Sequence, residues 1–263
     1  MPIRLRKHHL QSIAFKNQYN ETLSGTLYQP SSAGGLGFVL GHCFTCSRHT
    51  RILIDLGNTM AELGFSVLRF DFSGNGQSQG RFEESTYSKQ VEEMGTAIDF
   101  LKENGADRIL IGGHSMGGMV SLFTAAQRTD IRGVIALAIG SESLHPGRLL
   151  TDSQKSRLSD TGSTAFSSRG RDLVITRQFF DDAAGYDLRH VLPAVRCPVL
   201  VVLAAADTVT DPLPVKALFK DTHGHMDVLE VDEADHMFST AESRQTVIDY
   251  LPQWIRKYFS EGR

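Results

Sequence analysis

A serine lies between glycines at a place where it could act as a nucleophile. An apolar run that begins at Arg108 leads into Gly-His-Ser-Met-Gly at residues 113–117, and a helix-like segment follows. A sharp strand-to-helix turn exposes the hydroxyl of Ser115, and it requires glycine two residues to either side because side chains there would collide with neighbouring elements. The positive end of the following helix faces the same spot. The pattern is typical of a serine that attacks a carbonyl carbon, the alternative being a glycine-rich helix entrance without chemistry.

A serine hydroxyl needs an adjacent base, and the base needs an acid to orient it. Asp207 comes directly after the apolar run of residues 198–206, where a loop at the carboxyl end of a strand would hold it, and His236 follows the next predicted strand. We therefore predict Ser115 as nucleophile, His236 as base and Asp207 as acid. The competing acids are Asp211, Asp232 and Asp235. The first shares the loop of Asp207, and the other two are too near the histidine in sequence to reach its far nitrogen easily.

Acyl transfer also requires two hydrogen-bond donors for the negative oxygen of the tetrahedral intermediate. We expect the backbone N–H of Met116, the residue after the nucleophile, to be one donor. The second should come from the loop after the strand that ends at His42, where the N–H of Phe44 is the best candidate. For His114, the variable residue of the serine turn, packing or hydrogen bonding beneath the nucleophile is expected rather than catalysis.

The cysteines and the remaining histidines suggest neither a disulfide framework nor a metal site. Three cysteines, an odd number, indicate a reducing compartment. Cys43 and Cys46 have a spacing that allows redox or metal chemistry, but no second pair accompanies them, so two buried reduced thiols are expected, and core packing for Cys197. No carboxylate or cysteine completes a metal site around His223 and His225, which indicates a surface turn. We predict no metal and no cofactor.

The elements that must position these residues alternate between apolar strand-length runs and helix-length segments, as in parallel sheets covered by helices on both faces. Residues 11–16 and 21–28 precede them and indicate an antiparallel hairpin. The other predicted strands are Gly37–His42, Ser66–Asp71, Arg108–Gly112, Gly133–Ile139, Val199–Ala204 and Met226–Val231. The predicted helices span residues 51–63, 86–104, 115–127, 212–220 and 239–259. The sequence thus predicts an α/β fold with a mostly parallel central sheet of about eight strands.

One long segment interrupts this alternation. Residues 143–195 are far too many for an ordinary connection, and we predict that they form a cap inserted into a core made of residues 1–142 and 196–263. A disordered loop is the alternative, but the aromatic residues of this segment argue against disorder. The aromatic residues that we expect to bind substrate from the cap are Phe166, Phe179, Phe180 and Tyr186.

Composition excludes several classes of function. The chain has 263 residues, 27 Lys and Arg against 30 Asp and Glu, and 41% hydrophobic residues, an ordinary globular balance. A net charge of −3 does not suggest nucleic-acid binding or a basic membrane patch. No apolar run approaches the roughly 20 residues of a membrane span. The basic start has no apolar run behind it, so it is not a secretory signal. We expect a cytoplasmic protein without membrane or nucleic-acid partners.

The chain resembles α/β hydrolases over nearly its whole length. The resemblance is carried by Gly-His-Ser-Met-Gly-Gly at 113–118, Arg-Phe-Asp-Phe-Ser-Gly-Asn-Gly-Gln-Ser-Gln-Gly at 69–80 and Ala-Asp-His-Met-Phe at 234–238. Residues 71–86 are similar to cinnamoyl and feruloyl esterases and to serine aminopeptidase-like hydrolases. Gly-His-Cys-Phe-Thr-Cys-Ser at 41–47 resembles the hydrolase half of bacterial fusions with an osmotically inducible, peroxidase-like domain. Most relatives have glycine where this chain has Cys43.

The resemblance implies a cap after the sixth strand, and similar proteins form dimers through the cap. We therefore expect a monomeric or homodimeric serine hydrolase that cleaves small acyl or aryl esters through an acyl-enzyme, with a small-molecule ester as its partner. The same triad allows three alternative reactions. They are amide cleavage, as in aminopeptidases, thioester cleavage, and acyl transfer or lyase chemistry. The acids that could anchor a free amino terminus are Glu83, Glu84, Asp181 and Asp182. A binding protein that keeps the fold without turnover is a further alternative.

Overall fold

An eight-stranded sheet forms the centre of the computed structural model, which describes residues 8–30, 35–220 and 225–259. Its strands are β1 (His8–Lys16), β2 (Thr22–Pro30), β3 (Leu36–Gly41), β4 (Ser66–Phe70), β5 (Arg108–His114), β6 (Ile131–Leu137), β9 (Val199–Ala204) and β10 (Met226–Val231). Their order is β1-β2-β4-β3-β5-β6-β9-β10. The first two pairings are antiparallel and all others are parallel. The predicted α/β fold with its opening hairpin is therefore confirmed, whereas the basic start and His223 lie outside the described residues.

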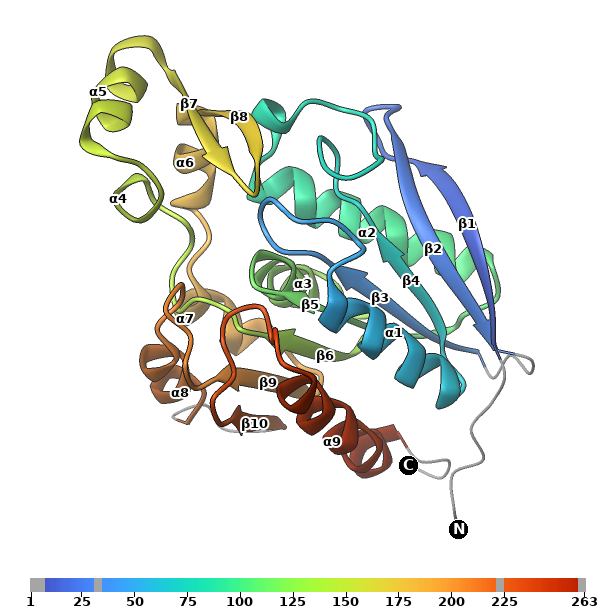
Figure 1. Cartoon of the computed structure of the whole chain (residues 1–263). Coiled ribbons are helices and arrows are strands. Elements are labelled where there is room, and N and C mark those ends of the chain that lie inside the picture. Colours follow the sequence, from blue (N-terminus) through green and yellow to red (C-terminus); the bar gives the residue numbers. More distant parts are fainter. Residues whose placement is uncertain (1–7, 31–34, 221–224, 260–263) are drawn as a thin grey trace.

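Helices cover both faces of this sheet (Figure 1). They are α1 (Arg51–Glu62), α2 (Tyr87–Glu103), α3 (Met116–Gln127), α8 (Pro212–Lys220) and α9 (Ala241–Phe259), with a short 3-10 turn, η1 (Phe82–Glu84). One apolar cluster joins α1 and α9 to one face, and a second joins α2, α3 and α8 to the other. The central strands are covered on both faces because their residues are apolar on both faces. All six residues of β9, for example, are buried and contact apolar neighbours on both sides.

One predicted strand begins and ends two residues early in the structure. The sequence predicts Gly133–Ile139, whereas β6 begins at Ile131 and ends at Leu137. Ala138, the next residue, has a φ of 46°, a left-handed conformation that cannot continue a strand. The chain therefore leaves the sheet two residues early, and the residues that follow turn toward the end of β9.

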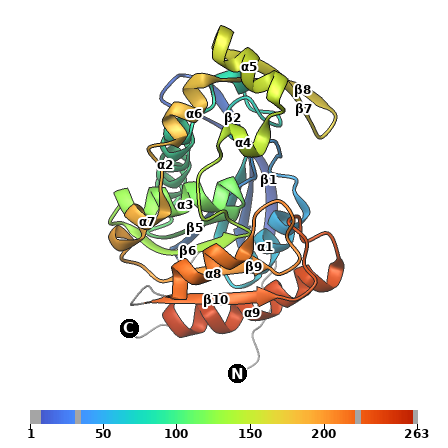
Figure 2. The ribbon, with the colours of Figure 1, turned by 90° about the vertical axis from the view of Figure 1, so that its left-hand side faces the viewer.

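Residues 143–195, which we call the cap segment, contain further elements between β6 and β9. They are α4 (Pro146–Leu149), α5 (Asp152–Thr161), β7 (Ser163–Ser168), β8 (Arg171–Thr176), α6 (Arg177–Ala183), α7 (Leu188–Val191) and η2 (Leu192–Ala194). Figures 1 and 2 both place α4, α5 and the β7–β8 hairpin together on the side of the core away from β10 and α9. A disordered loop is thus excluded. Arg169 and Gly170 join β7 to β8 with positive φ at both residues, as in a two-residue hairpin turn.

Candidate active site

Ser115 occupies the turn between β5 and α3. Its φ of 54° and ψ of −117° are costly for a residue with a side chain, by roughly 1–3 kcal/mol. The turn leaves no room for side chains on either flank: a Cβ added to Gly113 would lie 2.5 Å from the carbonyl oxygen of Gly41, and one added to Gly117 would collide with the same carbonyl. Both glycines are therefore required, as the sequence pattern indicates, and Ser115 lies directly before the N–H groups of the first turn of α3.

Asp207 and His236 meet at the carboxyl ends of β9 and β10. His236 Nδ1 lies 2.7 Å from Asp207 Oδ2, and both side chains are at most one-tenth exposed. The other oxygen of Asp207 accepts the backbone N–H groups of Val209 and Thr210, at 2.7 and 2.9 Å. Burial opposes ionisation of this carboxyl, but the hydrogen bonds from His236 and Thr210 outweigh it and lower the pKa of Asp207. The carboxylate thus stays charged and fixes the histidine ring.

The competing acids lie elsewhere. Asp211 accepts the N–H of Leu213, 3.0 Å away, at the start of α8. Asp235 is exposed and accepts the N–H groups of Met237 and Ser239, a local turn on the same loop. Asp232 is also exposed. Among the described residues, Asp207 is the carboxylate that is hydrogen-bonded to His236.

Thr210 is a site residue that sequence reasoning missed. Its hydroxyl lies 2.7 Å from Asp207 Oδ2, the oxygen that pairs with the histidine, and 3.4 Å from His236 Nδ1. The backbone and side chain of Thr210 therefore bind both carboxylate oxygens of Asp207. A threonine three residues after an aspartate in a loop is the only sequence signal, and it is common in turns without function.

His114 lies under the site, as the sequence led us to expect. It is fully buried, and its Nε2–H donates to the backbone carbonyl of His236 over 2.6 Å. Burial first, and then the charge of His236, lowers the pKa of His114 to about 3. His114 is therefore neutral across the physiological range and holds the loop of His236 by a hydrogen bond.

The loop after β3 carries Phe44, and a network around Asp71 holds that loop. The carboxylate of Asp71 is fully buried, accepts the backbone N–H of Arg48 at 2.6 Å, and pairs with the Arg48 guanidinium. His42 donates from Nδ1 to the carbonyl of Cys43 and accepts the N–H of Phe72 at Nε2. These bonds fix both ends of the loop, so the segment between them has a defined position beside the serine turn.

Cys43 and Cys46 are bonded to each other, contrary to the expectation of two reduced thiols. Their Cα atoms are 5.2 Å apart, and both side chains are buried. The backbone N–H of Cys46 also donates to the carbonyl of Cys43 over 3.0 Å, so a tight turn brings the two side chains together. An isolated pair of cysteines does not show this turn in sequence. The disulfide closes a small ring around Phe44.

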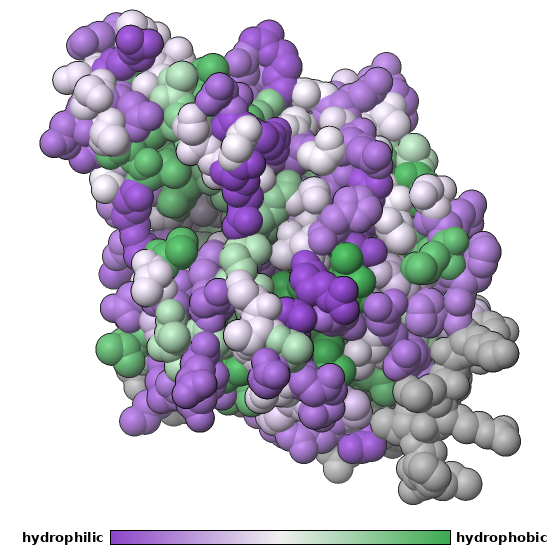
Figure 3. Space-filling view, in the orientation of Figure 1, coloured by the Kyte–Doolittle hydropathy of each residue, from purple (hydrophilic) through white to green (hydrophobic). Residues whose placement is uncertain are grey.

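A pocket of about 280 Å³ connects these groups. Ser115, His236, Met116 and Phe44 all line it, although no hydrogen bond joins the side chains of Ser115 and His236 in the described chain. Its apolar wall consists of Phe44, Tyr87, Met116, Met119, Leu144, Leu149, Val209 and Met237. Figure 3 shows a hollow between the cap segment and the core, with hydrophobic surface beside it.

The four cap aromatics do not line this pocket. The rings of Phe166 and Phe179 contact the ring of Phe44, with centroids 6.1 and 5.3 Å away, so they stand behind the loop that carries it. Phe180 packs on Phe179, and Tyr186 packs on Tyr87. Leu144 and Leu149 are the cap residues with apolar side chains in the wall. Hydrophobicity alone indicates that an aromatic ring is buried, and not which side of a loop it covers.

The acids that could anchor an amino terminus also lie outside the pocket. Glu83 pairs with Arg81, and Asp182 accepts the N–H of Ser88 at the start of α2. The acidic residue in the described wall is Glu142, which sequence reasoning did not single out. Across the described residues, no group of three or more His, Cys, Asp or Glu is arranged to hold a metal ion.

Several known proteins are similar to this chain. A family model described as serine aminopeptidase, S33, matches residues 45–143. The chain is 24% identical over 260 residues to an uncharacterised 31.7 kDa protein of Escherichia coli, covering 84% of this chain and 90% of the other. It is 36% identical over 83 residues to a human mitochondrial palmitoyl-protein thioesterase, covering 31% of this chain and 26% of that protein.

Two of the solved structures that match cover nearly the whole chain. A structure of Est1E from Butyrivibrio proteoclasticus with bound ferulic acid has a TM-score of 0.80 and 20% identity, covering 95% of this chain and 100% of the other. Alpha/beta hydrolase domain-containing protein 10 from mouse has a TM-score of 0.76 and 19% identity, covering 94% and 99%. No described helix has the length and apolarity to cross a membrane. The sheet order and these solved structures show that the chain has the α/β-hydrolase fold.

Proposed function

We propose that the protein hydrolyses small carboxylic esters through a covalent acyl-enzyme on Ser115. The observation that carries the proposal is the 2.7 Å hydrogen bond between His236 and Asp207, in the same pocket as a serine held at positive φ. A fold that only bound ligands would have no use for a costly serine conformation and a buried acid–base pair together.

In the first half of the reaction, Ser115 Oγ attacks the ester carbonyl carbon. The charged carboxylate of Asp207 has no proton to donate, so it must accept a hydrogen bond from His236 Nδ1–H. The other ring nitrogen, Nε2, is therefore unprotonated and can take the proton of Ser115. The N–H groups of Phe44 and Met116 bind the oxygen that becomes negative. The C–O bond then breaks, and His236 returns the proton to the departing alcohol.

In the second half, water attacks the acyl-enzyme, and His236 accepts its proton. Collapse of the second tetrahedral intermediate releases the carboxylic acid and restores Ser115. Asp207 stays ionised throughout and stabilises the imidazolium that forms twice in each cycle. The disulfide ring and the Asp71 network keep Phe44 in place while charge develops.

The wall of the pocket indicates the size of the acyl group. The catalytic pocket has a volume of about 280 Å³, which is below the roughly 300–1,000 Å³ of sites that bind drug-sized ligands. Tyr87, Leu144 and Leu149 make it apolar on the side of the cap segment. Short acyl chains or a single aromatic ring fit this space, so we propose that the cap segment limits the length of the acyl group.

The test is hydrolysis of p-nitrophenyl esters from acetate to decanoate, together with methyl ferulate. We expect the wild type to prefer the short chains and Ser115→Ala to lose nearly all turnover while it keeps its melting temperature. Ser156→Ala, an exposed serine on α5, is the matched control and should behave as wild type. Turnover retained by Ser115→Ala, or failure of Ser115 to react with a fluorophosphonate, would refute the mechanism.

Amide cleavage is a second candidate, favoured by the aminopeptidase family model and by the carboxylate of Glu142 in the wall. A free ammonium group of a peptide would then pair with Glu142. The test compares alanine p-nitroanilide with its N-acetylated form in the wild type and in Glu142→Gln. Cleavage of p-nitrophenyl esters without cleavage of either anilide excludes this candidate.

A further inference from the structure

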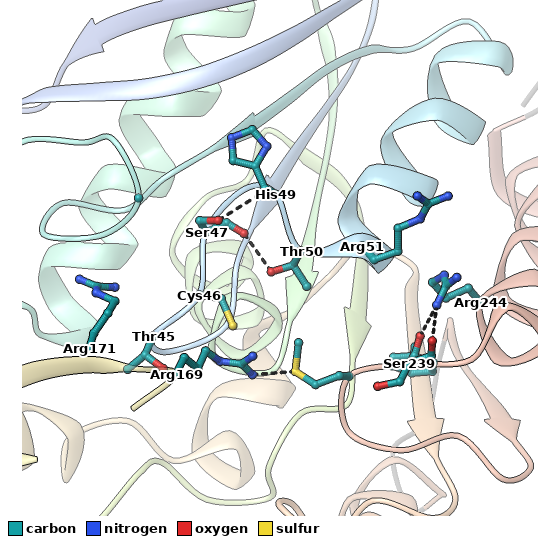
Figure 4. A pocket seen from close by; sticks show the side chains of 13 residues that line it. Thr45, Cys46, Ser47, His49, Thr50, Arg51, Arg169, Arg171, Ser239 and Arg244 are labelled. Atoms are coloured by element: carbon teal, nitrogen blue, oxygen red, sulfur yellow. Dashed lines mark hydrogen bonds between the residues drawn. The ribbon is translucent and has the colours of Figure 1, made fainter. Parts of the chain in front are cut away.

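A second, larger pocket adjoins the catalytic pocket. It has a volume of about 760 Å³ and lies between the β7–β8 hairpin and the N-terminal ends of α1 and α9 (Figure 4). Thr45, Arg169 and Met237 line both this pocket and the catalytic one, so the two are neighbours with a common wall. We call the larger one the basic pocket, because of the side chains described next.

Four arginines from three parts of the chain line the basic pocket, and none of its described lining residues is acidic. Figure 4 shows Arg169 and Arg171 on the hairpin side, with Arg51 on α1 and Arg244 on α9 opposite them. Arg51 and Arg244 share one carboxylate, that of Asp55, at 3.1 and 2.8 Å. Among the described residues, Asp55 is the carboxylate that pairs with these guanidinium groups, so the four arginines outnumber their acidic partner and make the lining net positive.

The two hairpin arginines have no carboxylate partner in the described chain. Arg171 donates to Asn75 Oδ1 at 3.3 Å and to the carbonyl of Gly74 at 3.1 Å, both neutral acceptors. Arg169 stands at the turn of the hairpin with a φ of 51°, and its guanidinium lies 2.9 Å from the sulfur of Met237. Like charges gathered without counter-charges repel each other, so an anion that bound here would be strongly favoured.

The position of the basic pocket tells which part of a substrate would reach it. His236 must give its proton to the leaving group, so the leaving group lies on the side of His236. Met237, the next residue, lines both the catalytic pocket and the basic one, whereas Leu144 and Leu149, at and before α4, line the catalytic pocket alone. A substrate with its acyl group at the leucines would thus extend its leaving group past Met237 into the basic pocket.

We propose that the basic pocket binds a phosphate-bearing leaving group, so that the preferred substrates are esters or thioesters of a phosphorylated alcohol or thiol. A carboxylate brings one negative charge to the unpaired arginines, whereas a phosphomonoester carries close to two and matches the planar fork of arginine. The inference rests on the proposed function. The acyl bond to oxygen or sulfur breaks, His236 protonates the departing atom, and the phosphate is unchanged.

The experiment compares butyryl thioesters of pantetheine, 4′-phosphopantetheine and coenzyme A, which share the acyl group and the reacting bond. The first two differ only in a phosphate, and coenzyme A adds a 3′-phosphorylated adenosine nucleotide. We expect kcat/KM to be at least about tenfold higher for the phosphorylated pair than for the pantetheine thioester, and this ratio to fall as salt rises. Arg171→Gln and Arg169→Gln should each lower the ratio by about tenfold. Arg157→Gln makes the same charge change at an exposed position on α5, outside the pocket, and should leave the ratio unchanged.

The outcomes separate the two proposals. Serine-dependent cleavage of all three thioesters at equal kcat/KM overturns the basic-pocket proposal and leaves the hydrolase function standing. A ratio lowered as much by Arg157→Gln as by Arg171→Gln also overturns it, because the cause would be net charge. No cleavage of the thioesters or of p-nitrophenyl esters overturns the proposed function itself. Calorimetry on Ser115→Ala should show coenzyme A binding more tightly than inorganic phosphate; equal binding would indicate a site for free anions and refute a leaving-group site.

Discussion

Replacement of Asp207 by asparagine isolates one feature of the site, the side of the His236 ring that carries the proton. Oδ1 of the asparagine can keep the N–H groups of Val209 and Thr210, which now lie 2.7 and 2.9 Å away. Its amide nitrogen would take the place of Oδ2 and point an N–H at His236 Nδ1. The ring must then carry its proton on Nε2, the nitrogen that should accept from Ser115.

The size of the effect follows from this exchange. The fold keeps two of the hydrogen bonds to the side chain, so the loss of stability should stay below about 3 kcal/mol. The reaction, by contrast, loses its general base in almost every molecule. We expect kcat to fall by about 10⁴-fold, which corresponds to about 5.4 kcal/mol of transition-state stabilisation.

The assay is hydrolysis of p-nitrophenyl butyrate at pH 7.5, with thermal unfolding to show that the variant is folded. Asp211→Asn is the matched control, because Asp211 lies in the same loop but contacts only the start of α8, and its kcat should stay near that of wild type. A kcat for Asp207→Asn within about tenfold of wild type would refute the assignment of the acid. An equal loss in both variants would show that the loop, and not the carboxylate, matters.

Three further predictions concern neighbouring groups. Burial depresses the pKa of His114 from 6.5 to about 3, so its contribution to stability is complete well above pH 6.5 and is lost as the pH falls. Between pH 6.5 and 5, the unfolding free energy in urea should drop by about 1.6 kcal/mol more in wild type than in His114→Phe, and parallel curves would contradict this. Thiol titration in denaturant without reductant should find only Cys197, and all three cysteines after reduction; three thiols at the start would disprove the Cys43–Cys46 bond. Thr210→Val should lower kcat by about tenfold, with rescue by Thr210→Ser, because only the hydroxyl bond to the carboxylate is lost; if serine does not rescue, the role is packing.

Much of the fold was open to prediction because most central strands are short apolar runs with a clear end. β9 and β10 have the predicted bounds, Val199–Ala204 and Met226–Val231, since polar or small residues flank both. The residues predicted for the triad come from the ends of such strands, and parallel strands bring their carboxyl ends to one edge of the sheet. Strand prediction therefore indicates which distant residues will meet.

Other features depend on contacts that the pattern of residues does not contain. The disulfide requires a turn that brings Cys43 and Cys46 together, and an isolated pair of cysteines gives no sign of it. Phe166 and Phe179 pack behind Phe44 because α6 and the hairpin cover that side of the loop, which depends on how the cap segment folds back. The sequence does not show that Arg171 donates only to neutral oxygens, so its unbalanced charge could not be predicted.

The ring of Phe44 belongs to two parts of the molecule at once. Its backbone lies in the loop proposed to bind the oxyanion, while its side chain packs among Phe82, Phe166 and Phe179, two of which come from the cap segment. In the proposed mechanism, a change in the cap segment therefore affects both which substrate binds and how fast it reacts. A cap grafted from a relative would place different side chains against Phe44 and would change kcat along with specificity. Substitutions in the cap would then require matching substitutions in the loop of Phe44.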